Sequence, residues 1–111
     1  VEKDGDLLVR FLRATHKSAS AILDAKDIDS ILDSVGKSFE IRALADRAVA
    51  KEDLLANAEL WVAKGRENLL RNVPEVWASA VEVMAKAGLI EPGVDAKTLY
   101  TNTLWDKAVK G

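Results

Sequence analysis

The chain has no cysteine, only two prolines, one histidine and few aromatic residues, which make up 5% of its 111 positions. The lack of cysteine excludes disulfides and thiolate chemistry, and it fits a cytosolic protein or a periplasmic one without disulfides. With aromatics scarce and alanine abundant, helix is favoured over sheet. No apolar run approaches the roughly 20 residues that cross a bilayer. The charged beginning, residues 1–6, is not a signal peptide.

Basic and acidic residues are nearly balanced. The sequence has 16 basic and 18 acidic residues, for a net charge of -2. No stretch concentrates lysine or arginine, so we expect no nucleic-acid partner. Apolar residues make up 49% of the chain, which excludes disorder. The length suits one domain, and we treat residues 1–111 as a single helical unit, interpreted as part of a larger binding protein for reasons given below.

Apolar residues recur at steps of three and four, which is the helical period, and nothing alternates with the period of a strand. The fold class we expect is therefore all-α, with five to six helices packed as a bundle. The segment 39–64 is either one long helix or two helices broken near residue 51. The other predicted helices span about residues 6–24, 28–35, 74–87 and 95–100, with a last turn at 103–105.

Local signals set several of these boundaries. Asp27 is a suitable N-cap, and Gly36 is expected to end the helix that Asp27 begins. Pro74 suits the first turn of a helix, where its missing N–H costs nothing. Gly88 ends that helix, and Pro92-Gly93 turns the chain.

No motif in the sequence indicates catalysis or a metal. His16 is the only histidine, and without cysteine a zinc site is improbable. The acidic stretch 24–33 fails the calcium-loop pattern, because its fifth and sixth positions are Ile31 and Leu32. We therefore expect no catalytic residue, no metal and no cofactor, and interpret the chain as a binding or structural module and not an enzyme.

The segment 87–102, "AGLIEPGVDAKTLYTN", has more apolar residues than a connection needs. Such residues must be covered by something, and we expect them to pack against other helices or a partner. Tryptophans at helical spacing are typical of a core, with a pocket as the alternative. The predicted packing or interface residues are Trp77, Leu89, Ile90, Leu99, Tyr100 and Trp105.

Two segments carry a resemblance to a known family. The stretch 74–102 combines Pro74, Glu75 and Trp77 with "AGLI", "VD" and "LYTN". It resembles the C-terminal end of the ABC-transporter substrate-binding proteins for nitrate, sulfonate, taurine and thiamine precursors. The stretch 7–17, "LLVRFLRATHK", is similar to the helix that leads from the second lobe of those proteins back toward the first. The resemblance covers their last third.

This resemblance implies a fold, a function and partners. The intact fold would have two α/β lobes around a cleft, with this chain as the C-terminal helical scaffold. The intact protein would bind a small anion or thiamine precursor and deliver it to the membrane permease of an ABC importer. Its location would be periplasmic, or extracellular and attached to the membrane. No position matches a family ligand motif, so the ligand-binding residues stay unknown.

In the intact family the tail wraps the first lobe. Alone, the chain would either form a compact bundle closed by its tail or associate as a homo-oligomer. An alternative is a self-contained helical module that binds a protein through the Trp77–Trp105 region. A distant third is a thiamine-precursor synthase, an enzyme of the same fold family that uses a histidine; His16 lies outside any matching motif.

Overall fold

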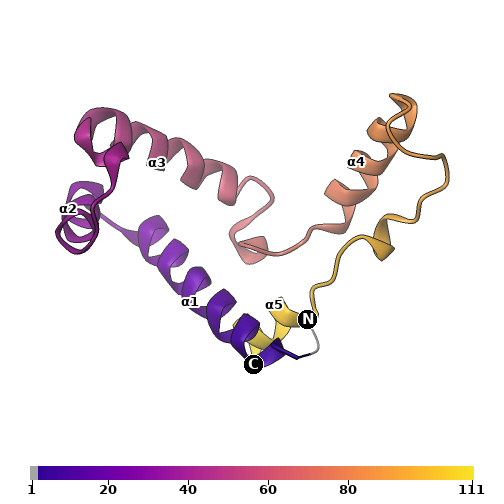
Figure 1. The fold of residues 1–111 in the computed structure, drawn as a ribbon, viewed down its shortest axis with the longest axis horizontal. Helices are drawn as coiled ribbons and strands as arrows, with labels where there is room; N and C mark the ends of the chain where they lie inside the picture. Colours follow the sequence, from indigo (N-terminus) through magenta and orange to yellow (C-terminus); the bar gives the residue numbers. More distant parts are fainter. Residues whose placement is uncertain (1–2) are drawn as a thin grey trace.

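The computed structural model describes residues 3–111, and all its regular structure is helical, with no strand in that range (Figure 1). The all-α class and the count of five α-helices are confirmed. These helices are α1 (Gly5–Asp24), α2 (Ile28–Ser38), α3 (Arg47–Trp61), α4 (Pro74–Lys86) and α5 (Thr103–Trp105). Short turns lie between or after them: η1 (Arg42–Ala45), η2 (Arg66–Asn68), η3 (Ala96–Thr98) and η4 (Asp106–Lys110).

The helices form an open arch (Figure 1). The chain measures 49 × 34 × 25 Å, with a radius of gyration of 17.4 Å. A compact chain of this length would have a radius of gyration of about 13 Å. The tail therefore does not close the helices into a compact bundle, which was one of the two alternatives expected from the sequence beside a homo-oligomer, and no single core is shared by all of them.

The base of the arch, which we call the hub, consists of α1, Leu69, α5 and η4. Leu69 is 1% exposed, and Trp105 from α5 is 5% exposed. The Trp105 indole Nε1 donates a hydrogen bond to the Leu69 carbonyl at 2.8 Å. Arg13 of α1 donates to the carbonyls of Ala108 and Lys107 at 2.9 and 3.0 Å, near the end of η4. The first and last helices are thus joined by both packing and hydrogen bonds.

The far end of the arch is made by α2 and α3. Asp27 caps α2 by accepting from the backbone N–H of Asp29, as predicted. The Asp29 carboxylate pairs with Lys51 of α3 at 2.5 Å, and Arg47 pairs with Asp33 at 2.5 Å. The hydrogen bond and charge of Lys51, helped by Arg47, hold the pKa of Asp29 below its usual range.

Two predicted boundaries are wrong. Helix α2 runs through Gly36 to Ser38, and a Cβ at Gly36 would lie 3.3 Å from the Leu44 side chain. Glycine therefore serves close packing there and not termination. The segment 39–64 is broken earlier than residue 51, because Asp46 caps α3 by accepting from the Val49 N–H.

The side of the arch drawn in orange, residues 73–101, we call the arm (Figure 1). It contains α4, a turn and η3, which packs back on α4. Pro74 begins α4 as predicted, and Gly88 ends it with a left-handed φ of 70°. The predicted helix at 95–100 shortens to η3, whose start is capped by Asp95 through the Lys97 N–H.

Candidate docking surface

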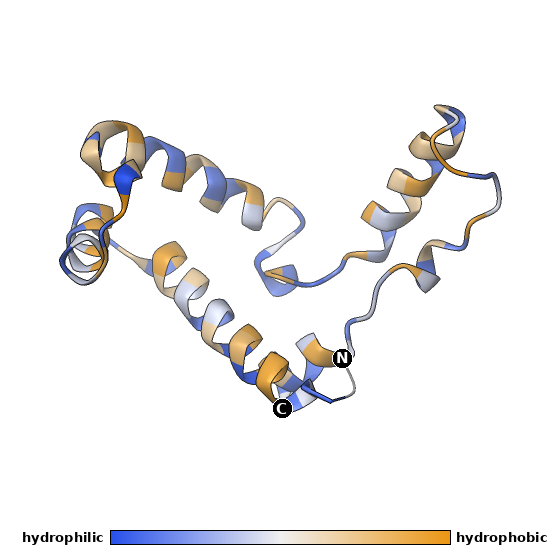
Figure 2. Cartoon of the chain, in the orientation of Figure 1, coloured by the Kyte–Doolittle hydropathy of each residue, from blue (hydrophilic) through white to orange (hydrophobic). Residues whose placement is uncertain are grey.

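The described part of the chain leaves many large apolar side chains uncovered. Five apolar residues are buried, whereas thirteen large apolar residues are 40–73% exposed. Figure 2 shows apolar positions along every long helix. The exposed residues are Leu7, Phe11, Phe39, Ile41, Val49, Leu55, Leu60, Leu70, Val76, Val83, Met84, Leu89 and Leu99. Single exposed apolar residues are ordinary, but a surface this rich in them is typical of a docking face.

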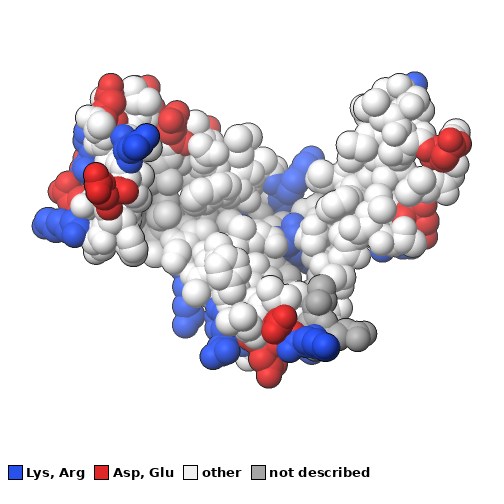
Figure 3. Space-filling view, viewed as in Figure 1, with Lys and Arg blue, Asp and Glu red and all other residues white. Residues whose placement is uncertain are grey.

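Charged side chains stand at several places on the face that Figure 3 draws. They gather at the α2–α3 end, along the base and at the tip of the arm, and basic side chains also lie between α3 and the arm. Uncharged side chains cover much of the face between these groups, and depletion of charge is typical of the core of a protein–protein interface.

The inside of the arch holds a hollow between the end of α3 and the start of α4, which we call the notch. Its volume is about 250 Å³. Leu60, Leu70 and Val76 line it and are 73%, 40% and 43% exposed. Trp61 and Trp77 form deeper parts of its wall, and Lys64 and Arg71 bring positive charge to it. The notch therefore has a mixed wall, in which apolar side chains alternate with basic residues and with the amides of Asn68 and Asn72.

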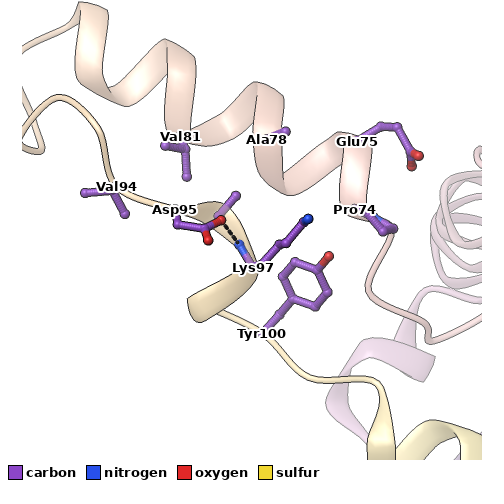
Figure 4. A pocket seen from close by; sticks show the side chains of 9 residues that line it. Pro74, Glu75, Ala78, Val81, Val94, Asp95, Lys97 and Tyr100 are labelled. Atoms are coloured by element: carbon purple, nitrogen blue, oxygen red, sulfur yellow. Dashed lines mark hydrogen bonds between the residues drawn. The ribbon is translucent and has the colours of Figure 1, made fainter.

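A second hollow, of about 450 Å³, lies between α4 and the returning tail (Figure 4). Val81 and Val94 face it from the two sides, and Tyr100 lies at its lower end. The Asp95 carboxylate is already engaged with the Lys97 backbone N–H, 3.0 Å away. The hollow therefore offers apolar contact with little convergent polar chemistry, as a seam between packed segments does.

The six predicted packing or interface residues divide into two groups. Trp105 is buried in the hub, Trp77 and Tyr100 stack at 5.4 Å between ring centroids, and Ile90 is half-buried. Leu89 and Leu99 are 73% and 49% exposed. The structure brings together Trp77 and Tyr100 but places Trp105 in a different part of the chain. Both tryptophans make internal contacts, so they do not form an exposed binding face.

The two ends of the arm are fastened to each other by a pair of asparagines, which we call the clasp. The Asn72 N–H donates to the Asn102 side chain at 2.9 Å, and the Asn102 side chain donates to the Asn72 carbonyl at 2.8 Å. The Asn72 side chain donates to the Thr101 carbonyl at 3.0 Å and accepts from the Trp77 indole at 3.1 Å. Each side-chain amide thereby satisfies backbone groups where two chain segments cross.

His16 lies in the hub, with its ring edge-on to Trp105 at 6.5 Å between centroids. Within residues 3–111, no carboxylate pairs with it, and no group of three or more His, Asp or Glu side chains gathers as a metal site would require. Its surroundings are those of a packing residue. None of the described helices is both long and apolar enough to cross a membrane.

Sequence reasoning missed the exposed residues of α3 and α4. A signal for them was present: α4 has apolar residues both at Trp77 and Val81 and at Val76 and Val83, which is more than one face. A helix that is apolar on two faces needs two neighbours. The clasp had no comparable signal, because its two asparagines are 30 residues apart.

Comparison with known proteins gives no relative. No family model, no curated protein and no solved structure matches the chain.

Proposed function

We propose that this chain is the C-terminal scaffolding segment of a solute-binding component of an ABC importer. The observation that carries the proposal is the open arch, with thirteen large apolar side chains at least 40% exposed. A segment made to wrap a neighbouring lobe would present such a surface when that lobe is absent. The proposal also rests on the resemblance of residues 7–17 and 74–102 to the end of that family.

In this role the chain itself performs no chemistry. The arm would cover one side of the missing lobe, with Leu89 and Leu99 buried against it, and α3 would cover another through Leu60. The intact protein would lie in the periplasm, or outside the cell and attached to the membrane. It would bind a small anion or thiamine precursor, close its lobes and deliver the ligand to a membrane permease.

The length of the encoding gene is the first test. The mass of the chain, measured by intact mass spectrometry, is compared with the mass that the gene encodes. We expect the gene to have a much longer reading frame that includes an export signal. A thermal-shift panel of nitrate, alkanesulfonates and pyrimidines should then raise the melting temperature of the full protein with at least one class, because a ligand that binds only the folded state stabilises it. A gene encoding only these residues would sink the proposal.

A pair of substitutions tests the docking surface directly. Leu89→Asp should cost the intact protein about 1.5–3 kcal/mol, the value of burying a leucine, and cost the isolated chain almost nothing. Glu91→Gln, at an exposed polar position of the same tail, changes the charge by the same one unit, is the control and should be silent in both. Equal effects of Leu89→Asp in the two proteins would show that no neighbour covers this residue.

A second candidate is a self-contained helical module that binds another protein. The hub favours it, because Arg13, Leu69 and Trp105 close a small core from within this chain. It uses the exposed faces of α3 and α4 and not the tryptophans. Under this proposal the 111-residue chain melts cooperatively by itself and stays monomeric, whereas a scaffolding segment associates through its exposed faces as a homo-oligomer.

A further inference from the structure

The arm is held to the rest of the chain by little apart from the clasp. Among the described elements, α4 packs extensively on η3 alone, and neither α1 nor α3 forms a comparable contact with it. The chain enters the arm after Asn72 and leaves it before Asn102, and these two residues are hydrogen-bonded to each other. The position of the arm is therefore set at these two residues and not by a packed core.

The clasp joins both sides of this connection. On the hub side, the Asn102 carbonyl accepts from the Asp106 N–H at 2.8 Å, which ties Asn102 to the beginning of the last helices. On the arm side, Asn72 accepts the Trp77 indole hydrogen bond, and Trp77 stacks on Tyr100. The arm is internally tied as one unit, and the clasp joins its two ends next to the hub.

Backbone strain lies two residues before the clasp. Leu70 has a φ of 60°, the left-handed region that disfavours leucine, while the other left-handed residues described are Gly65, Gly88 and Gly93. Leu70 is 40% exposed, so burial of its own side chain does not explain the strain. Leu69 before it is fixed by burial and by Trp105, and Asn72 after it is fixed by the clasp. Leu70 occupies the third position of a tight turn that the Arg71 N–H closes by donating to the Asn68 carbonyl at 2.9 Å, and a turn of this kind requires the left-handed region at that position.

We propose that the clasp is a releasable latch that holds the arm in one position, and that the strained turn at Leu70 beside it is the hinge. When the clasp hydrogen bonds break and this turn opens, Leu70 returns to the extended region and the arm turns relative to the hub. The notch is lined by residues of both α3 and α4, so its shape changes with the turn. The latch would let the docking surface adjust to the neighbour that it meets.

Pairs of spin labels on the 111-residue chain can measure the position of the arm. The chain has no cysteine of its own, so Ala56→Cys on α3 and Val83→Cys on α4, both at exposed positions, give one labelled pair. Double electron–electron resonance then reports the distribution of distances between α3 and the arm. The parent pair should show one dominant distance.

Three variants change the latch in known directions. Asn102→Ala removes the clasp and should broaden the distribution or add a second distance. Leu70→Val, whose branched side chain tolerates the left-handed region less well, should raise the ratio of displaced to latched arm by up to about tenfold. Leu70→Asn, which tolerates that region, should narrow the distribution.

Asn57→Ala is the matched control, because the Asn57 side chain bonds only the Asp53 carbonyl of its own helix. Circular dichroism confirms that each variant keeps its helices. If the Leu70→Val variant loses its helices, the Leu70→Asn variant still tests the latch. The latch is overturned if Asn102→Ala and Leu70→Val give the parent distribution, if Leu70→Asn fails to narrow it, or if Asn57→Ala broadens it as much as Asn102→Ala does.

Discussion

The hub and the arm use tryptophan in different ways. In the hub, Trp105 is 5% exposed, donates to the Leu69 carbonyl and has Arg71 and Lys110 over its ring at 5.7 and 5.4 Å. In the arm, Trp77 is half-buried and has a stacked ring on one side and the clasp beside it. Trp105 is surrounded by contacts as a core residue is, whereas Trp77 is only partly covered. Substitutions in the hub should therefore lower the stability of the chain more than substitutions in the arm do.

The largest expected effect is the loss of the hub's central ring. Trp105→Ala should destabilise the chain by about 3–5 kcal/mol, because it leaves a cavity against Leu69 and removes a buried hydrogen bond. Such a loss should abolish the cooperative part of a circular dichroism melt. A variant that melts like the parent would show that the hub is not the stable part of the molecule.

The same substitution in the arm should do less. Trp77→Ala should cost about 1–2 kcal/mol, because it removes a stacked pair and one hydrogen bond from a partly exposed site. Hydrogen exchange should quicken within residues 73–101 and stay unchanged in α1. If α1 exchange rises equally, the arm and the hub are one cooperative unit and the contrast between them fails.

The tie between the first and last helices comes next. Arg13→Met keeps most of the side-chain packing and removes two hydrogen bonds to the Ala108 and Lys107 carbonyls. We expect a loss of about 1 kcal/mol, since these bonds are only partly shielded from water. Arg10→Met, on an exposed position of α1, is the control for the lost charge. Urea unfolding of the two variants measures the difference.

The smallest effect should come from acid, at the far end of the arch. The pKa of Asp29 is lowered in the folded chain by Lys51, so its contribution to stability is present above its unfolded pKa. The contribution is lost as the pH falls through the lower folded pKa. Melting temperatures from pH 7 to pH 2 should therefore fall slightly less in Asp29→Asn than in the parent, and identical curves would contradict the pairing.

Local rules predicted the helices well, because caps and periodicity act over a few residues. Asp27, Pro74 and Gly88 behave as their types predict. Gly36 does not, because Leu44 from a later turn packs against it. The glycine at this position is required by a contact with another element, and such a contact cannot be predicted from the local sequence pattern.

The candidate docking surface was predicted only in part. The exposed apolar residues Leu89 and Leu99 of the tail could be predicted, because loops lie at the surface and a loop with so many apolar residues needs a neighbour to cover it. Leu60 and Val76 were not predicted, since an apolar position on a helix has the same sequence pattern whether its neighbour is present or not. The clasp depends on side-chain amides meeting across 30 residues of sequence, which periodicity cannot indicate.

The hydrogen bonds from Arg13 join residues 94 and 95 positions apart, and this separation has a kinetic consequence. Closing so long a loop is entropically costly, so such contacts form late in folding. The stack of Trp77 on Tyr100 closes a much shorter loop. During synthesis, α1 would leave the ribosome long before its partners α5 and η4. The side of α1 that packs on them would therefore stay exposed to solvent until they are synthesised.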